Sequence, residues 1–258
     1  MKIGLLYICV GRYSTFWKDF YLSCEKYLIP EAEKHYFVYT DSDIFDKENP
    51  RVHIYPIEKR GWPFDTLLRF EIFLKAETEL EKMDYLYFFN ANEKLLKNVG
   101  KEFLPDIDDE LVVAIHPAFY NKKREEYAYE NNVESLAYIP DNEGVMYVAG
   151  GLNGGRGKEY LKMIKELSRR TQEDFSKNII ARVHDESHLN KYILDKKVKV
   201  LHPGYIYPEE YKLPYEKIIV CRDKRFWGGH DFLRGITDRK SKKEYLIALW
   251  KQLRRVFK

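Results

Sequence analysis

The chain has 258 residues, of which 45% are hydrophobic, so it is long enough for one large or two small domains and too apolar to be disordered. Its net charge of +3 is too small to indicate a nucleic-acid-binding protein, for which a clustered basic face is expected. The widely spaced cysteines Cys9, Cys24 and Cys221 form no CxxC pair, which indicates reduced core thiols and a cytoplasmic protein.

The chain begins with an apolar run, MKIGLLYICV, that lacks a cleavage site and is too short to span a bilayer. We expect it to form the first strand. Runs rich in Val, Ile, Tyr and Phe predict further strands at 35–40, 52–57, 84–89, 111–116, 145–149, 198–201 and 217–221. Helical periodicity predicts helices at 14–28, 63–82, 158–174, 185–195 and 242–256. This alternation predicts an α/β fold with a mostly parallel, Rossmann-like sheet flanked by helices.

The chain divides, by composition, into a domain over residues 1–235 and a basic amphipathic helix or tail over 236–258. Lysines and arginines at 239–243 and 251–258 surround an apolar stripe of Leu246, Leu249, Trp250 and Leu253. Such a segment can make a weak contact with a membrane surface or pack on the domain. The sequence leaves both open, and therefore also whether the protein is peripheral at the inner membrane surface.

Residues that directly follow predicted strands are candidates for a site, because ligands of open α/β sheets bind beyond the carboxyl ends of strands. The stretch YFFNANEKLL (87–96) places Asn90 and Asn92 two residues apart at such a point. The glycine-rich stretch VAGGLNGG (148–155) does not match a phosphate-binding loop, and we interpret it as a bend. Ala149, Gly150 and Gly151 would give a wall almost without side chains, although a plain tight turn fits equally well.

Two further residues stand out by their surroundings. His116 opens the stretch HPAFYNKKREEYAYE (116–130), in which aromatic rings could stack on a sugar and the histidine could bond a hydroxyl. A structural histidine is the simpler interpretation of that stretch alone. Arg69 lies on a largely apolar predicted helix, LLRFEIF, where a charged group usually points to a partner or ligand, although a surface arginine is also compatible.

The stretch HDESHLNKY (184–192) allows three interpretations. His184 and His188 are four residues apart and could bind zinc, but the metalloprotease pattern needs Glu directly after the first His, and Asp185 stands there. Asp185 and Glu186 could simply favour a helix N-terminus. Alternatively, Glu186 could stabilise the oxocarbenium-like state of a sugar transfer. The local sequence does not choose among them.

The stretches KIGLLYICVGRYSTF (2–16), HPAFYNKKRE (116–125), AYIPDNEG (137–144) and HDESHLNKY together resemble glycosyltransferase family 6 over about residues 2–225. This family includes the blood group A and B transferases, the α1,3-galactosyltransferase and the Forssman synthase. The resemblance implies a GT-A fold and the retaining transfer of Gal or GalNAc from a UDP-sugar to form an α1,3 bond.

The resemblance also implies roles for individual residues. Glu186 matches the catalytic carboxylate, which also faces the acceptor, and His116 matches an acceptor contact. Residues expected to bind the donor are Ile8, Cys9, Val10, Tyr13, Arg69, Asn90, Ala91, Asn92, Ala149, Gly150, Gly151, His184 and Asp185. Val183 replaces a tryptophan of the family, which affects the expected packing of the acceptor.

Asn90-Ala91-Asn92 stands where animal members read DVD, so two carboxylates of a metal site are replaced by neutral amides. This should weaken Mn²⁺ binding severely. We therefore expect an enzyme without a metal or other cofactor, in which Arg69 or the cations Arg222, Lys224 and Arg225 neutralise the leaving UDP.

The expected reaction is transfer of GalNAc from UDP-GalNAc to O3 of the galactose in a Fucα1,2-Gal acceptor such as 2′-fucosyllactose. The expected donor preference rests on the space that Ala149 and Gly151 leave for the acetamido group of GalNAc. A galactosyltransferase that uses UDP-Gal and a catalytically inactive sugar-binding relative are the alternatives.

Overall fold

The computed structural model describes residues 1–44 and 48–256, with side chains described up to residue 252 at the C-terminal end. Its main sheet has the strand order β3-β2-β1-β4-β7-β6-β8. The strands are β1 (Lys2–Cys9), β2 (Glu33–Thr40), β3 (Val52–Pro56), β4 (Tyr85–Phe89), β6 (Leu111–Ile115), β7 (Val148–Arg156) and β8 (Val198–Leu201). All neighbours are parallel except β7, which is antiparallel to β4 and β6. The predicted mostly parallel α/β sheet is confirmed.

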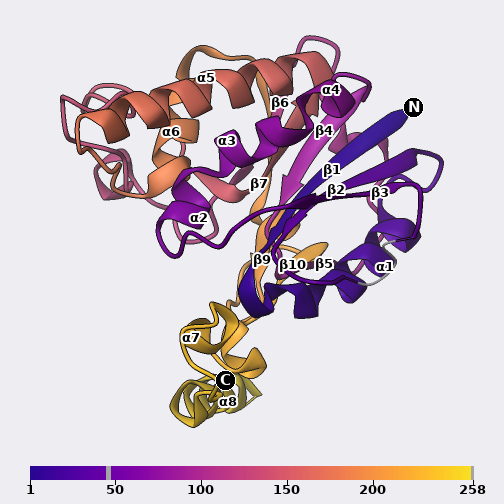
Figure 1. Ribbon diagram of the computed structural model, residues 1–258. Helices are drawn as coiled ribbons and strands as arrows, with labels where there is room; N and C mark the ends of the chain where they lie inside the picture. Colours follow the sequence, from indigo (N-terminus) through magenta and orange to yellow (C-terminus); the bar gives the residue numbers. More distant parts are fainter. Residues whose placement is uncertain (45–47, 257–258) are drawn as a thin grey trace.

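Helices cover both faces of this sheet, as Figure 1 shows. One face packs on α1 (Trp17–Tyr27) and on a small sheet of β5 (Glu93–Leu95), β10 (Ile219–Cys221) and β9 (Tyr207–Pro208). The other face packs on α3 (Arg69–Phe73) and α5 (Gly157–Ser176). Each face therefore has its own apolar core, which holds the strands rigidly and fixes where their carboxyl ends lie.

The glycine-rich stretch forms the strand β7, so its interpretation as a bend is wrong. Its antiparallel direction places residues 149–151 beside the carboxyl end of β4. Glycine is needed within this strand because Gly154 lies opposite Tyr87, and a Cβ on Gly154 would come within 2.1 Å of Cδ1 of that ring. The composition suggested a turn, but the strand uses glycine for close packing.

The helix predicted at 63–82 is interrupted. The other predicted helices are present, with the predicted bounds at 242–256 and with shifted ends elsewhere. The interrupted helix consists of α2 (Phe64–Leu67), α3, η2 (Leu74–Ala76) and α4 (Glu77–Leu80). The break falls at Leu68, and it allows α2 to contact α6 (His184–Tyr192) while α3 contacts α5. The remaining short helices are η1 (Gly11–Phe16), η3 (Lys101–Phe103), η4 (Arg124–Glu126), η5 (Ile193–Asp195), η6 (Pro203–Ile206), η7 (Lys224–Trp227) and α7 (His230–Leu233).

The C-terminal segment projects below the sheet and ends in α8 (Lys242–Val256). Arg12 anchors it by donating from Nη1 to the carbonyls of Phe232 at 2.8 Å and Thr237 at 3.0 Å. The buried Ala248 shows that one side of α8 packs inward. The side chain of Leu253 from the predicted stripe, and residues 257–258, lie outside the described part. No helix in the described part of the chain could cross a membrane.

Candidate active site

A cavity of about 380 Å³ opens at the carboxyl ends of β1 and β4, where the strand-end rule places ligands. It brings together, from segments far apart in the chain, the predicted residues Ile8, Val10, Tyr13, Arg69, Asn90, Ala91, Asn92, Gly150, Gly151, His184, Asp185, Glu186 and Lys224. The predicted donor site is thus largely one continuous surface.

Cys9 and Ala149, by contrast, are buried in the apolar core on the α1 side of the sheet and do not line this cavity. Successive side chains of a strand point to opposite faces, so Ile8 and Val10 face the cavity while Cys9 faces inward. The expected contribution of the Ala149 side chain to a roomy wall is corrected accordingly.

Of the predicted cations after β10, only Lys224 lines the cavity, with its Nζ 5.3 Å from the centre of the Tyr13 ring. Arg222 is buried, donates to Oδ2 of Asp19 at 2.7 Å and lies over the ring of Phe16. Arg225 donates from Nε to Oδ1 of Asp223 at 2.7 Å. The expectation that all three face the donor is therefore corrected, because two of them are held by carboxylates outside the cavity.

Arg69 crosses from α3 to the floor of the cavity. It is only 6% exposed, and its guanidinium carbon lies 4.2 Å from the centre of the Phe88 ring. Its Nη1 donates to the carbonyl of Gly150 at 2.7 Å and lies 3.1 Å from Oδ2 of Asp185. A buried arginine between a strand and a helix start therefore holds the two sides of the site together.

The peptide of Gly150 is the centre of this arrangement. Its N–H donates to Oε2 of Glu186 at 2.6 Å, while its carbonyl accepts from Arg69 and from Nδ2 of Asn153 at 3.0 Å. A Cβ on Gly150 would lie 3.0 Å from Oδ2 of Asp185 and 3.1 Å from Cβ of Glu186. Glycine therefore lets the two acidic side chains approach β7.

Burial dominates the electrostatics of these carboxyl groups. It raises the pKa of Asp185 to about 7, although Arg69 opposes the shift, and the charge of Glu186 raises it further. Burial also raises the pKa of Glu186, which the Gly150 N–H, the nearby Tyr147 hydroxyl and Arg69 partly offset. These partners favour the ionised form of Glu186, so one fixed carboxylate can face a developing positive charge.

The two asparagines have different surroundings. Asn92 is buried, and its Nδ2 donates to the carbonyl of Arg222 at 2.8 Å, so this amide also ties β4 to the end of β10. A Cβ on Gly151 would lie only 2.5 Å from Nδ2 of Asn90, which is too close for both atoms to keep their positions. The absence of a side chain at Gly151 therefore makes room for the Asn90 amide. A side chain at position 151 would affect a bound donor by displacing that amide.

The residues at this strand end do not fit a divalent metal site. Asn90 and Asn92 offer neutral amides, and the described residues contain no group of three His, Cys, Asp or Glu side chains placed to hold a metal ion. Mn²⁺ and Mg²⁺ sites are built on charged oxygen ligands. Within the described residues, His184 and His188 likewise belong to no cluster that could bind zinc, and His188 is fully buried within the protein.

His184 begins α6 with φ at +53°, in the left-handed region that a non-glycine residue rarely adopts. Its Nδ1 is buried without a hydrogen-bond partner, and the side chain lines the cavity. Such strain at a cavity is typical of a functional position.

His116 does not line the cavity. Burial lowers its pKa to about 4, and Nδ1 accepts from the N–H of Ala118 at 3.1 Å. Its ring lies 5.8 Å from that of Tyr147, whose neighbour across the site is Glu186. His116 is thus one aromatic layer behind the carboxylate, and its role as an acceptor contact stays a prediction.

One wall of the cavity was not predicted from the sequence. This wall consists of Lys59, Gly61, Trp62, Asp65, Thr66, Arg234 and Ile236. Phe88 and Val183, the residue that replaces a tryptophan of the family, also line the cavity. Trp62 is 59% exposed, lies edge-on to His184 and is covered by the guanidinium of Arg234. An exposed tryptophan in a Gly-Trp-Pro sequence was the available signal, but nothing in the sequence pairs it with residue 234.

Comparisons with known proteins find relatives over most of this chain. The model of glycosyltransferase family 6 matches residues 1–224. The O-antigen biosynthesis glycosyltransferase WbnI of Escherichia coli is 38% identical over 225 residues, which cover 87% of this chain and 95% of that protein. Histo-blood group ABO system transferase 1 of Rattus norvegicus is 32% identical, with 81% of this chain and 61% of the relative covered. Globoside alpha-1,3-N-acetylgalactosaminyltransferase 1 of Gallus gallus is 29% identical, with 85% and 66% covered.

Proposed function

Because the chain belongs to glycosyltransferase family 6, we propose that it transfers GalNAc from UDP-GalNAc to O3 of a fucosylated galactoside, with retention and without a metal ion. The acceptor class is Fucα1,2-Gal, as in 2′-fucosyllactose, and the product resembles the A antigen. The family and the GT-A-like α/β fold establish a hexosyltransferase that uses a nucleotide sugar and a glycan. Donor, acceptor and metal independence are the parts proposed here.

The observation that carries the proposal is the placement of Glu186. Its carboxylate is held by the Gly150 N–H at 2.6 Å, in the same cavity as Lys224, Asn90 and His184. A fixed anion on one side and a cation on the other suit a reaction that separates a sugar cation from a phosphate.

In the proposed reaction the bond between C1 of the sugar and the β-phosphate oxygen breaks, and its electron pair leaves with UDP. The Glu186 carboxylate stabilises the positive charge at C1. The acceptor O3 then bonds to C1 from the side that UDP has left, and its proton passes to the β-phosphate. A covalent bond between Glu186 and C1, later displaced by the acceptor, gives the same stereochemical result.

Lys224 supports the metal-free part of the proposal. It is the cation of the 222–225 run that reaches the cavity, and it can neutralise charge on the diphosphate as a point charge. Transfer should therefore continue in excess EDTA and change little on addition of Mn²⁺. As a matched control, the double variant Asn90→Asp with Asn92→Asp restores two carboxylates and should make turnover sensitive to both reagents. Loss of wild-type activity in EDTA with recovery in Mn²⁺ would overturn this part.

The GalNAc preference rests on Gly151, which lacks a side chain and therefore leaves room for the Asn90 amide without pushing it further into the cavity. We expect kcat/KM for UDP-GalNAc to exceed that for UDP-Gal about tenfold or more, the usual range for pocket contacts of this size. Gly151→Ala should push the Asn90 amide, 2.5 Å from the new Cβ, into the cavity and shift the preference towards UDP-Gal. Adding Asn90→Ala removes the displaced group and should restore the preference for UDP-GalNAc.

UDP-Gal transfer is the second candidate, and the catalytically inactive sugar-binding relative is the third. Equal use of both donors by the unmodified protein would contradict the GalNAc preference but leave the transferase intact. If no UDP is released from either UDP-GalNAc or UDP-Gal, with fucosylated and with unfucosylated galactosides as acceptors, the inactive sugar-binding relative is favoured instead.

A further inference from the structure

Positive charge is concentrated at the C-terminal end of this chain. Residues 236–258 contain eight lysines and arginines and two acidic residues, a formal charge of +6, whereas the whole chain carries +3. Residues 1–235 therefore carry a net charge of −3. The mildly basic character of the protein comes entirely from its C-terminal segment, and an acidic domain is followed by a basic helix.

The helix α8 combines this charge with exposed apolar side chains. Leu246 is 60% exposed, Ile247 39% and Trp250 53%. Lys243 and Lys251 stand four residues before and after Ile247 on the same side of the helix, and both are exposed. The outward surface of α8 is thus an apolar stripe bordered by lysines.

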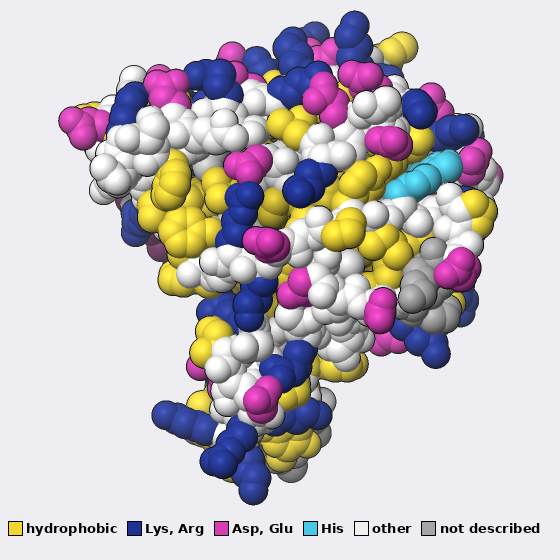
Figure 2. Space-filling view, viewed as in Figure 1, with side chains coloured by type: hydrophobic (Ala, Val, Ile, Leu, Met, Phe, Trp, Pro, Cys, Tyr) yellow, Lys and Arg dark blue, Asp and Glu magenta, His cyan; other side chains and the backbone are white. Residues whose placement is uncertain are grey.

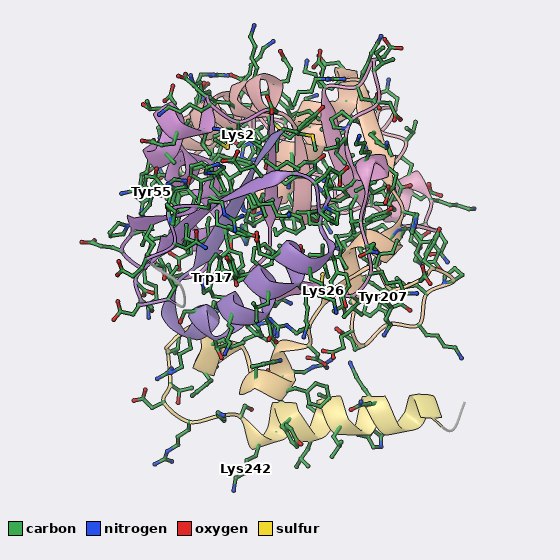
Figure 3. All side chains as sticks on the ribbon, turned by 90° about the vertical axis from the view of Figure 1, so that its right-hand side faces the viewer. Lys2, Trp17, Lys26, Tyr55, Tyr207 and Lys242 are labelled. Carbon is green, nitrogen blue, oxygen red and sulfur yellow. The ribbon has the colours of Figure 1, made fainter. Side chains whose placement is uncertain are left out.

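This stripe lies at the edge of the molecule. Figure 3 shows α8 along the lower border, with Lys242 pointing away from the rest of the chain. In Figure 2 the same lobe carries lysines and arginines next to hydrophobic side chains. The inward side is used for packing, through Ala248 and through Tyr245, whose ring lies 5.8 Å from that of Phe226.

We propose that α8 is a docking surface for an anionic lipid bilayer. An in-plane helix with aliphatic and aromatic residues on one stripe and lysines beside it can place the stripe among the acyl chains while the lysines contact lipid phosphates. Charge complementarity selects this occupant over a neutral surface. The apolar residues of the stripe have no use in a purely electrostatic contact with nucleic acid.

The position of α8 in the chain gives this surface a consequence for the cavity. Arg234 and Ile236 line the cavity, and a short segment joins them to Lys242 at the start of α8. Arg12 fixes that segment to η1. A bilayer bound to α8 would therefore hold the whole domain, and with it this cavity, near the membrane surface. The binding itself does not depend on which sugar is transferred.

The test is flotation of the full chain with vesicles of phosphatidylcholine alone or mixed with phosphatidylglycerol. We expect flotation only with the mixed vesicles, and its loss when NaCl rises from about 0.1 M to about 1 M, because the screening length shortens from about 10 Å to about 3 Å. Lys242→Glu with Lys243→Glu should lower the apparent affinity by about fivefold or more for each lysine. Leu246→Ser should lower it about tenfold through the lost apolar burial.

As matched controls, equivalent substitutions are made at exposed residues of the domain over 1–235. Lys158→Glu with Lys212→Glu alters the net charge equally, and Ile107→Ser removes a residue that is 91% exposed. Both should float like the unmodified protein. Equal flotation with neutral vesicles, or equal losses in the controls, would overturn the proposal. The absence of flotation with the mixed vesicles would also overturn it. If light scattering then shows a dimer that the α8 substitutions dissociate, α8 binds a second copy of the chain instead.

Discussion

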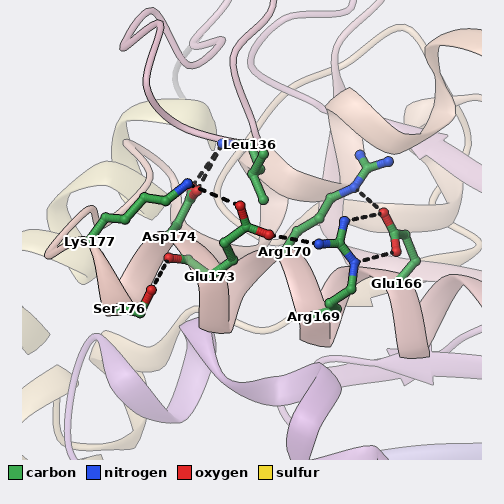
Figure 4. A network of polar contacts seen from close by, with 8 residues as sticks. All are labelled: Leu136, Glu166, Arg169, Arg170, Glu173, Asp174, Ser176 and Lys177. Carbon is green, nitrogen blue, oxygen red and sulfur yellow. Dashed lines mark hydrogen bonds and ion pairs between the residues drawn. The ribbon is translucent and has the colours of Figure 1, made fainter.

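The surface of α5 and the floor of the cavity both contain networks of arginines and carboxylates, but the two networks differ in burial. On α5, Glu166 accepts from Arg169 and Arg170, and Glu173 accepts from Arg169 and Lys177, as Figure 4 shows. All five side chains are at least partly exposed. In the cavity, Arg69 and Asp185 form a single ion pair in which each side chain is less than a tenth exposed.

The difference in burial indicates that the number of ion pairs in a region is a poor guide to their contribution to stability and activity. Exposed pairs contribute between about 0 and 1 kcal/mol, because water already solvates both partners well. Removing one partner of a buried pair costs about 3–5 kcal/mol, because the other charge is left unpaired in a poor solvent. The sparser network is therefore the one on which folding and activity should depend.

Glu186→Gln should give the largest effect, since it removes a charge from the buried site and keeps the shape. We expect kcat to fall by about 10²–10⁴, as for the loss of one preorganised stabilising group. Steady-state transfer from UDP-GalNAc measures it. Glu166→Gln makes the same change in the exposed network and should leave kcat unaltered. A near-normal kcat for Glu186→Gln would remove this carboxylate from the mechanism.

Arg69→Met should have the next largest effect, this time on stability. It leaves Asp185 buried without its partner and should lower the free energy of unfolding by about 3–5 kcal/mol. Chemical denaturation would measure it, with Arg169→Met as the control, expected to leave the free energy of unfolding nearly unchanged because this arginine is exposed. Similar losses in both variants would show that burial does not separate the networks.

Lys224→Ala tests the cation that belongs to neither network. A charge-assisted contact with phosphate is worth about 1.5–3 kcal/mol, so the affinity for UDP should fall about ten- to a hundredfold. Calorimetric titration of UDP measures this directly. Arg225→Ala is the matched control, because that guanidinium is held by Asp223 outside the cavity. A stronger effect of Arg225→Ala would relocate the neutralising charge.

The smallest predicted effect is a difference in pH dependence. The raised pKa of Asp185, about 7, means that the folded state binds a proton that the unfolded state releases above 3.8, so this group lowers stability as pH rises between these values. The lowered pKa of Glu166, about 2, has the opposite sign, and its contribution is lost as pH falls below 4.5. Melting temperatures should therefore decline less steeply from pH 5 to pH 7 in Asp185→Asn, and Glu166→Gln should leave that slope unchanged.

Much of the fold could be predicted because strands and helices here follow simple patterns. The strands β1 after Lys2, β2 from Tyr36 and β4 are nearly continuous runs of apolar and aromatic residues, as expected for parallel strands covered on both faces. β7 was misread because its glycines are selected by neighbours such as Tyr87 and Asn90, which no local pattern reveals. The helix at 63–82 was predicted without its break for the same reason, since the break serves contacts with two different helices.

The candidate site could be predicted where a residue directly follows a strand, as with Val10 and Asn90, or where the family resemblance supplied it, as with Glu186. The prediction that Arg222 and Arg225 face the donor was wrong, because a sequence does not show that Asp19 and Asp223 lie close enough to hold them. Trp62 and Arg234 were also not predicted, because they meet only in the folded chain.

The anchoring of the C-terminal segment by Arg12 has a consequence for how the chain folds. Arg12 and its partners Phe232 and Thr237 are 220 and 225 residues apart in the sequence. Closing so long a loop costs conformational entropy, which is much smaller once the strands that precede residue 222 have paired and brought the two segments close together. The sheets therefore form the framework first, and the part of the cavity wall that contains Arg234 and Ile236 is completed afterwards.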